Sequence, residues 1–440
     1  MAISRNKTHV AIIGAGFCGL AAGYELCKRG VRVTLFEKDA EIGGLAGSFR
    51  VNGVQLEKFY HHWFTNDVHV MALIDELGTR DRVIFRPTRT GMYCANNLFK
   101  LSTPFDVLRF NQLPVIDRFR LGLMALRVRK IKNWRQLENL TASQWLRQIG
   151  GDKVYEVVWK PLLRGKFGEY ASEVSAVWFW NKLKLRGGSR GLGGEEQLAY
   201  YRGGFAALAN QITLQIESAG GRVILNTSAD GLLVSDGKIT GVMSRNEKFT
   251  ADAVIATPAL PLIADLVAPH VSREYVDQLR RIKYLGNVCL VLELDRSLSD
   301  IYWLNVSDPG FPFVGVIEHT NFEPRDSYGG RHLVYLSKYL SESDQLCQMK
   351  DSELLEFTLP YLQRVFPSFK PQWILEYHVW RARYSQPVIE RHYSTLIPAY
   401  ETPLQHLFLA TMAQIYPEDR GTNYAIREGR MIARELISRL

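Results

Sequence analysis

The first forty residues alternate between apolar runs and short breaks rich in glycine or charge. Val10–Ile13 are four consecutive apolar residues, which is typical of a buried strand. Residues 20–28 then follow a helical pattern that Gly30 ends, and residues 31–36 form a second apolar run. The pattern predicts a β-α-β unit, the building block of a parallel sheet flanked by helices.

The same patterning continues along the rest of the chain. Val288, Leu290, Leu292 and Leu294 alternate with other residues and predict one face of a long strand between residues 284 and 339. Helices are expected over residues 67–77, after a capping box at Thr141, and over residues 421–434. Other strands and hairpins are expected at 51–57 around Asn52-Gly53, at 91–101 around Asn96-Asn97, and at 222–225, 231–235, 238–244, 253–256 and 407–411.

The turn inside the first β-α-β unit has the spacing Gly14-x-Gly16-x-x-Gly19. In such a turn the first glycine allows a tight bend, the second lets the backbone approach a pyrophosphate, and the third allows close helix–strand packing. The helix N-terminus then offers free N–H groups to the phosphates. Glu37, 18 residues beyond Gly19, ends the second strand, where a carboxylate binds ribose hydroxyls. An acid here favours FAD or NAD over NADP.

A second glycine cluster, Gly43-Gly44 followed by Gly47, comes soon after Glu37. The combination resembles the superfamily of FAD-dependent amine oxidases, protoporphyrinogen oxidases and phytoene desaturases, which includes UDP-galactopyranose mutase. The segment from Gly421 resembles that superfamily's C-terminal signature, in which a helix points its N-terminus at the flavin. The resemblance implies FAD as cofactor, with contacts at Gly14, Gly16, Phe17, Cys18, Gly19, Glu37, Lys38, Gly43, Gly44, Leu45, Ala46, Gly421, Thr422 and Asn423.

The resemblance also implies a fold and a division into domains. We expect an α/β protein of mixed α+β character, with a Rossmann-type FAD-binding domain, a mixed-sheet substrate domain and a helical cap insertion. The FAD-binding domain would be discontinuous, with one strand passing the adenine near residues 229–232. The expected boundaries are 1–100, 200–265 and 405–440 for the FAD-binding domain, 101–199 for the cap and 266–404 for the substrate domain.

Composition adds limits to this picture. The chain has 440 residues, 46% hydrophobic and 22% charged residues, and a net charge of +9, as in an ordinary globular protein. Its five scattered cysteines have no C-x-x-C spacing, which argues against a disulfide framework or zinc site and fits a reducing, cytoplasmic compartment. No stretch has 18 consecutive apolar residues, so no transmembrane helix is expected. Gly187–Gly194 predicts a mobile loop at the edge of the site.

Positive charge gathers between Arg109 and Arg135, where eight basic residues and one acid are interleaved with apolar residues. One interpretation is a helical cap with a buried apolar face and a solvated basic face. The other is peripheral contact of residues 105–135 with an anionic membrane. We favour the cap. Nucleic acid is not expected as a partner, because no recognition module accompanies the charge, and the sequence indicates no oligomeric state.

The flavin would perform hydride transfer, so the protein need supply only a dry pocket, a proton-handling group and a substrate clamp. Tyr60, His61 and His62 follow the second glycine cluster and are the candidate catalytic residues, and no metal is expected. For an anionic substrate, the candidate clamps are Arg381, Arg383 and Arg420. No second Gly-x-Gly-x-x-Gly is present for a dedicated NAD(P)H site.

Three functions are compatible with these residues. The first is an FAD-dependent oxidoreductase that oxidises or desaturates a hydrophobic or amphipathic substrate, with a lipid-like and an anionic molecule both open. The second is a mutase related to UDP-galactopyranose mutase, which acts on a sugar nucleotide or glycan without net redox change. The third is a lipid-binding escort like the Rab GDP-dissociation inhibitors. The intact glycines, Glu37 and Gly421 disfavour the third.

Overall fold

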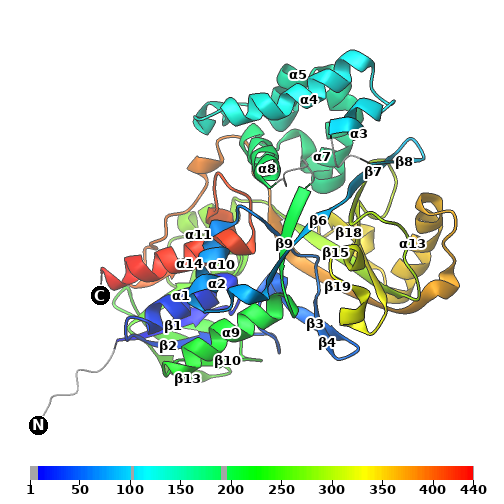
Figure 1. The fold of residues 1–440 in the computed structure, drawn as a ribbon. Helices are drawn as coiled ribbons and strands as arrows, with labels where there is room; N and C mark the ends of the chain where they lie inside the picture. The colour runs from blue at the N-terminus through cyan, green and yellow to red at the C-terminus, as the bar shows by residue number, and fades with distance from the viewer. Residues whose placement is uncertain (1–7, 101–103, 190–195, 440) are drawn as a thin grey trace, which may run out of the picture.

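The computed structural model describes residues 8–100, 104–189 and 196–439. The first large sheet along the chain is parallel and lies at the lower left in Figure 1. The strand order is β10-β2-β1-β14-β20, and all neighbouring pairs are parallel. The strands are β1 (His9–Ile13), β2 (Arg32–Phe36), β10 (Arg222–Ile224), β14 (Ala253–Ala256) and β20 (Leu407–Leu409). The predicted α/β class is confirmed, and chain segments far apart in sequence build one sheet.

Helix α1 (Phe17–Cys27) packs between α9 (Gly204–Ser218) and α14 (Thr422–Ile437) beside this sheet, and α2 (Val68–Glu76) lies against α14 (Figure 1). The two ends of the chain therefore meet in α1 and α14. Their backbones come very close, because a Cβ built on Gly429 of α14 would lie 2.1 Å from the carbonyl oxygen of Cys18.

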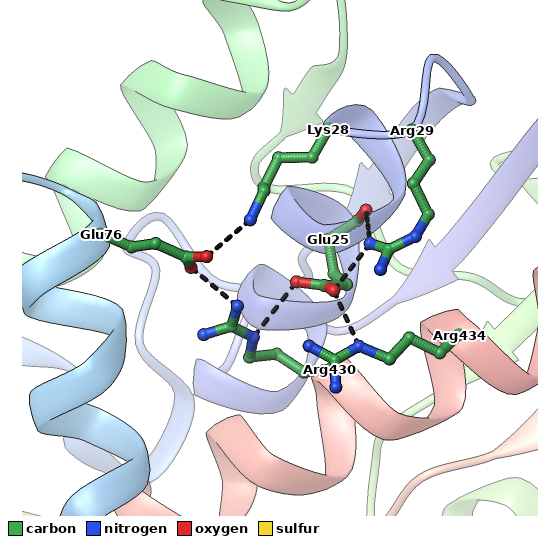
Figure 2. A network of polar contacts seen from close by, with 6 residues as sticks. All are labelled: Glu25, Lys28, Arg29, Glu76, Arg430 and Arg434. Carbon is green, nitrogen blue, oxygen red and sulfur yellow. Dashed lines mark hydrogen bonds and ion pairs between the residues drawn. The ribbon is translucent and has the colours of Figure 1, made fainter.

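A network of ion pairs joins α1, α2 and α14 around Glu25, which is only 1% exposed (Figure 2). Glu25 accepts from Arg29 at 2.6 Å, Arg434 at 2.9 Å and Arg430 at 3.1 Å. Arg430 also reaches Glu76 of α2 at 2.7 Å. Burial alone would raise the pKa of Glu25, but the hydrogen bonds from Arg434 and Arg29 hold it below its usual value. The carboxylate is thus charged and fully paired inside the helix contact.

The remaining elements around the parallel sheet are a small antiparallel sheet and two helices. A turn at Asp236-Gly237, where both residues have positive φ, joins the first two strands of that small sheet. The elements are β11 (Gly231–Ser235), β12 (Lys238–Ser244), β13 (Glu247–Thr250), α10 (Leu260–Val267) and α11 (Arg273–Arg280).

A second, mixed sheet has seven strands in the order β19-β15-β18-β17-β16-β7-β8, with one parallel pair, β16 and β7. On β15, Leu290, Leu292 and Leu294 face one apolar cluster while Cys289 and Val291 face another, so the predicted alternation is confirmed. The elements are β7 (Thr90–Cys94), β8 (Asn97–Lys100), β15 (Tyr284–Leu294), β16 (Trp303–Val306), β17 (Gly315–Glu318), β18 (His332–Leu340), β19 (Ile374–Pro387), α12 (Gln345–Gln348) and α13 (Asp351–Val365).

Two predictions need correction here. Residues 90–100, assigned above to the FAD-binding domain, lie in the seven-stranded sheet, because β7 pairs with β16 rather than with the parallel sheet. The hairpin turn between β7 and β8 falls on Ala95-Asn96 instead of Asn96-Asn97, and both turn residues have positive φ.

A group of helices lies above both sheets in Figure 1, where the cap was expected. The capping box at Thr141 is confirmed. The helices are α3 (Pro104–Arg109), α4 (Val115–Lys130), α5 (Ala142–Gly150), α6 (Asp152–Val154), α7 (Lys160–Phe167) and α8 (Ala176–Gly188). Residues 190–194 of the predicted mobile loop lie outside the described residues. None of the helices described is both long enough and apolar enough to span a bilayer.

Short antiparallel strands connect these regions. The predicted hairpin at Asn52-Gly53 is present, and the aromatic segment that follows it leads into a small three-stranded sheet. The strands are β3 (Ser48–Val51), β4 (Val54–Glu57), β5 (Trp63–Phe64), β6 (Val83–Thr88) and β9 (Glu196–Tyr201).

The close contact of α1 and α14 predicts a strong effect of Gly429→Ala. The added methyl group has no space against the Cys18 carbonyl, so the helices must separate, and we expect the free energy of unfolding to fall by about 1–3 kcal/mol. Urea unfolding followed by circular dichroism measures this.

Gly122→Ala is the matched control, since a Cβ at this exposed position of α4 has no neighbour within 4 Å. Alanine's better helix propensity should leave the stability unchanged or raise it by up to about 1 kcal/mol. Equal urea midpoints for Gly429→Ala and the wild type would contradict the account of the α1–α14 contact.

Candidate functional site

The glycine turn after β1 has the geometry expected of a pyrophosphate cradle. Gly14 has a φ of +96°, and a Cβ on Gly19 would lie 2.0 Å from the Gly14 carbonyl oxygen, so both positions require glycine. Gly16 has an ordinary φ of −71° and begins α1 without a side-chain cap among the described residues. A Cβ on Gly16 would meet only the Cα of Gly44, at 3.8 Å. Gly16 is therefore not required by packing, and its missing side chain leaves the start of α1 open to a phosphate.

Glu37 lies at the end of β2, as predicted, and is 6% exposed. Its two carboxylate oxygens accept from the backbone N–H groups of Ala15, at 2.8 Å, and Asp39, at 3.0 Å. Each oxygen has a further lone pair, so the carboxylate can also accept from ribose hydroxyls. The backbone N–H of Thr227 donates a hydrogen bond to the backbone carbonyl of Glu37. The segment before β11 therefore lies beside this acid.

The second glycine cluster lies directly on the first. The N–H of Gly43 donates to the carbonyl of Ala15 at 2.9 Å, and Gly43 forms a parallel bridge with Gly16. Gly44 has a φ of +59°, and a Cβ there would lie 3.2 Å from the Cα of Gly16. The two clusters thus form one backbone surface, from which Leu45 and Ala46 continue toward the centre of the molecule.

The N-terminus of α14 supplies the third part of the site. Gly421 precedes the helix, and no described side chain caps it. The side chains of the next two residues have other partners: the Thr422 hydroxyl accepts from Trp63 at 2.7 Å, and Asn423 Oδ1 accepts from the N–H groups of His69 and Val70. Thr422 and Asn423 therefore offer backbone N–H groups to a ligand, while their side chains hold α14 against β5 and α2.

A cavity adjoins the second glycine cluster at Leu45 and the start of α14 at Arg420. It brings together two predicted catalytic residues, one predicted clamp and one predicted cofactor contact. The lining residues are Leu45, Phe59, Tyr60, His61, Asn287, Tyr339, Ser385 and Arg420. Leu45 and the backbone at the start of α14 are the groups that would hold the isoalloxazine ring of FAD, and Leu45 lines this cavity.

His61 and His62 have different surroundings. His61 lines the cavity, and its Nδ1 lies 2.6 Å from the Phe59 carbonyl. His62 does not line it, and its Nδ1 is bonded to the Tyr302 hydroxyl at 3.0 Å. Burial lowers the pKa of His61 to about 4 and, together with the nearby charge of Arg186, that of His62 to about 3.

Both rings are therefore neutral near pH 7. A neutral His61 donates from Nδ1 to the carbonyl of Phe59, which leaves Nε2 as a proton acceptor. Burial and the neighbouring Tyr339 raise the pKa of Tyr60 well above its usual value, so its hydroxyl remains a hydrogen-bond donor.

Of the three predicted clamps, one lines the cavity and two are paired elsewhere. Arg420 lines the cavity and donates to the Tyr339 hydroxyl at 2.7 Å. Arg381 does not line it, since its guanidinium is paired with Asp351 at 2.6 Å and with the carbonyl of Met349. Arg383 is likewise paired with Glu342 at 2.8 Å. The assignment of Arg381 to the site is therefore corrected, because β19 directs this residue toward α13.

Sequence reasoning missed several residues of this site. Lys166 and Lys182, on α7 and α8, lie near Asp419 and Arg420, and Asn287 and Ser385 come from the seven-stranded sheet. One signal in the sequence could have indicated further charged groups at this site. It is the acid Asp419 beside the predicted clamp Arg420, immediately before the C-terminal signature.

One group of possible metal ligands is present among the described residues, formed by Glu293, Glu376 and His378. Arg331 already pairs with Glu293 and Glu376, so a positive charge occupies the place that an ion would take. This group is an ion-pair cluster on β15 and β19, away from the residues that line the cavity.

Comparisons with known proteins agree with this geometry. The model of the family of flavin containing amine oxidoreductases matches residues 17–437. Protoporphyrinogen oxidase 2 of Arabidopsis thaliana is 31% identical over 26% of this chain and 23% of its own length, so the alignment covers less than a quarter of that relative. Zeta-carotene desaturase of Solanum lycopersicum is 22% identical over 92% of this chain and 76% of its own length.

A solved structure of reduced UDP-galactopyranose mutase superposes with a TM-score of 0.75 at 15% identity, covering 99% of this chain and 96% of the other. This likeness shows a shared fold. Together with the family match, it confirms the resemblance inferred from the glycine clusters and the C-terminal signature, and with it FAD as the cofactor. The chain belongs to the family of flavin-containing amine oxidoreductases.

Proposed function

We propose that this protein is an FAD-dependent oxidoreductase that oxidises or desaturates an amphipathic small molecule at the cavity lined by Tyr60, His61 and Arg420. The observation that carries the proposal is that one cavity is lined both by Leu45, which follows the joined glycine clusters, and by Arg420, which comes directly before Gly421 and α14. The bound flavin supplies a hydride acceptor.

The chain's own residues supply the rest of the chemistry. His61 Nε2 can take the proton that leaves the substrate, since burial keeps the ring neutral and the Phe59 carbonyl fixes its orientation. Tyr60 can donate a hydrogen bond to a substrate oxygen or nitrogen. Arg420 places a positive charge at the cavity wall, where an anionic group is stabilised.

A mutase reaction on a sugar nucleotide is the second candidate, favoured by the structural likeness to UDP-galactopyranose mutase over nearly the whole chain. The two candidates differ in electron flow. An oxidoreductase is reduced by its substrate, whereas the mutase needs a reduced flavin before it turns over.

We further propose that the outer face of α3 and α4 contacts an anionic membrane surface. Seven large apolar side chains there are 43–70% exposed: Phe105, Leu108, Val115, Ile116, Phe119, Leu123 and Leu126. Met124 and Val128 of α4 are buried instead, so α4 is apolar on two sides. The exposure of Leu123 and Leu126 differs from the interpretation favoured above, a cap with one apolar face in the core. Nearby basic residues suit anionic lipid.

The cofactor assignment predicts that Gly16→Ala weakens FAD binding without disturbing the fold. The new methyl group makes one ordinary contact inside the protein but enters the space in front of the α1 N-terminus. We expect the dissociation constant for FAD to rise about tenfold or more, a loss of about 1.4 kcal/mol or more. The measurement is a fluorescence titration of flavin-stripped protein, with the urea midpoint as a check on folding. Gly122→Ala serves as control, and equal FAD affinity in Gly16→Ala and Gly122→Ala would contradict the assignment.

The reaction predicts that substrate, and not NADPH alone, bleaches the flavin band at about 450 nm under anaerobic conditions. Coproporphyrinogen III, cyclohexylamine and a carotene form a first panel of reductants. With the compound that reacts, His61→Gln should slow flavin reduction about 100-fold or more. Since the pKa of His61 is lowered to about 4, the wild-type rate should fall only as the pH drops toward 4, and His61→Gln should lose this limb. Bleaching by NADPH alone, without oxidation of any substrate, would favour the mutase.

The membrane proposal predicts that the protein sediments with vesicles containing anionic phosphatidylglycerol and less with pure phosphatidylcholine. Phe119→Glu should lower binding about tenfold or more, because an inserted Phe is worth about 1.5–3 kcal/mol. Leu214→Glu is the matched control, as Leu214 is 55% exposed on α9 whereas Phe119 is 59% exposed on α4. A vesicle affinity that Phe119→Glu leaves unchanged would show that this face does not touch the bilayer.

A further inference from the structure

Four cations from α7, α8 and the segment before α14 converge beside the cavity. We call Lys166 of α7, Lys182 and Arg186 of α8, and Arg420 before α14 the cationic cluster. Lys182, Lys166 and Arg420 all act electrostatically on Asp419, and Arg186 acts on Lys166. The cluster therefore lies where α7 and α8 meet the segment that leads into α14.

The cluster contains more positive than negative charge. Lys182 pairs with Asp419 at 2.6 Å, and Arg186 with Glu196 at 3.6 Å. Arg420 donates to the hydroxyl of Tyr339, and no ion pair of Arg420 with a described carboxylate is present. The Lys166 ammonium lies over the rings of Phe167, Trp178 and Tyr339, and no described carboxylate lies within ion-pair distance of it. Asp67 also interacts electrostatically with Lys182. With Lys166 protonated, four cations therefore face three carboxylates, which leaves a surplus of one positive charge.

The electrostatics of the cluster reflect this surplus. Burial alone would raise the pKa of Asp419, but Lys182, Lys166 and Arg420 hold it far below its usual value. Burial and the neighbouring cations lower the pKa of Lys166 to about 7, despite the opposing effect of Asp419. Arg420 Nε is buried and has no hydrogen-bond partner in the described structure. An unpaired buried donor is costly unless a ligand completes it.

The surplus charge is continuous with the cavity. Arg420 and Tyr339 both line it, and the Lys166 ammonium lies 5.0 Å from the centre of the Tyr339 ring. Arg420 also acts electrostatically on His61. A ligand that fills the cavity can therefore place one end against Lys166 and Arg420 and its other part beside His61.

We propose that the substrate carries a phosphate or diphosphate group, which Lys166, Lys182 and Arg420 bind while the reacting part lies in the cavity. This rests on the oxidoreductase function proposed above and narrows its substrate class. A carboxylate offers two acceptor oxygens, whereas a phosphate group offers three and so can accept from Lys166, Lys182 and Arg420 together. Lysines suit phosphate as compact charges, and Arg420 adds directional donors. The group can belong to a lipid phosphate or to a nucleotide.

The test is calorimetric titration of the FAD-loaded protein, whose own pyrophosphate site is filled, with inorganic pyrophosphate. We expect saturable binding to the wild type that weakens as ionic strength rises. Lys166→Gln should weaken it about tenfold or more, the value of one charge-assisted hydrogen bond. Lys184→Gln should leave it unchanged, because Lys184 lies on α8 but is exposed and stacks on Trp180, outside the cluster.

Two further ligands identify the source of the group. Dodecyl phosphate binding more tightly than pyrophosphate, with dodecanol not binding, indicates a lipid phosphate. Tighter binding of uridine diphosphate indicates a nucleotide. Either result supports the proposal when Lys166→Gln weakens it.

Equal pyrophosphate affinity in Lys166→Gln, Lys184→Gln and the wild type would overturn the proposal. A second result would also overturn the proposal: Lys166→Gln changes the reduction potential of the flavin but leaves the pyrophosphate affinity unchanged. The cluster would then act on the flavin and not on a phosphate group. If FAD binds and is bleached by a substrate while pyrophosphate does not bind, the proposed function stands and this inference fails. If FAD does not bind at all, the proposed function fails first.

Discussion

The packing of α1 against α14 is the constraint on which the cofactor site depends. Gly429 lets the helices approach so closely that a Cβ there would lie 2.1 Å from the Cys18 carbonyl oxygen. The buried Glu25 of α1 also pairs with Arg430 and Arg434 of α14 (Figure 2). The glycine turn begins α1, and Gly421 begins α14. Fixing the two helices therefore fixes the distance between the pyrophosphate cradle and the helix end that meets the flavin. Separating the helices would leave the buried Glu25 carboxylate without its partners, which is costly, so the ion pairs favour this geometry.

Around the cavity, neutral titratable groups and positively charged groups occupy separate places. His61, His62 and Tyr60 are kept neutral by burial, while Lys166, Lys182, Arg186 and Arg420 concentrate positive charge a short distance away. The cations also help to lower the pKa of both histidines. A proton acceptor beside an anion-binding wall is the arrangement that an amphipathic anionic substrate requires.

The helices between residues 104 and 188 have one side at the site and another side exposed on the protein surface. Their inner side contributes Lys166, Lys182 and Arg186 to the site, and the outer side of α3 and α4 exposes apolar residues among basic ones. The proposed substrate, with an apolar part and a charged end, would match both sides, as the proposed membrane contact requires.

The sequence by itself determined the cofactor half of this protein. Glycine spacing, apolar runs and Glu37 are local features, and each one limits the backbone next to it, so the parallel sheet and the two glycine clusters were predictable. The choice between His61 and His62, the loss of Arg381 from the site and the place of residues 90–100 were decided only by tertiary structure. Each depends on which distant element a residue packs against: β19 carries Arg381 to Asp351, and β7 pairs with β16. The cationic cluster is the clearest case, because its residues come from α7, α8 and the segment before α14 and share no local pattern. Burial and long-range pairing are properties of the folded chain, and no spacing in the sequence encodes them directly.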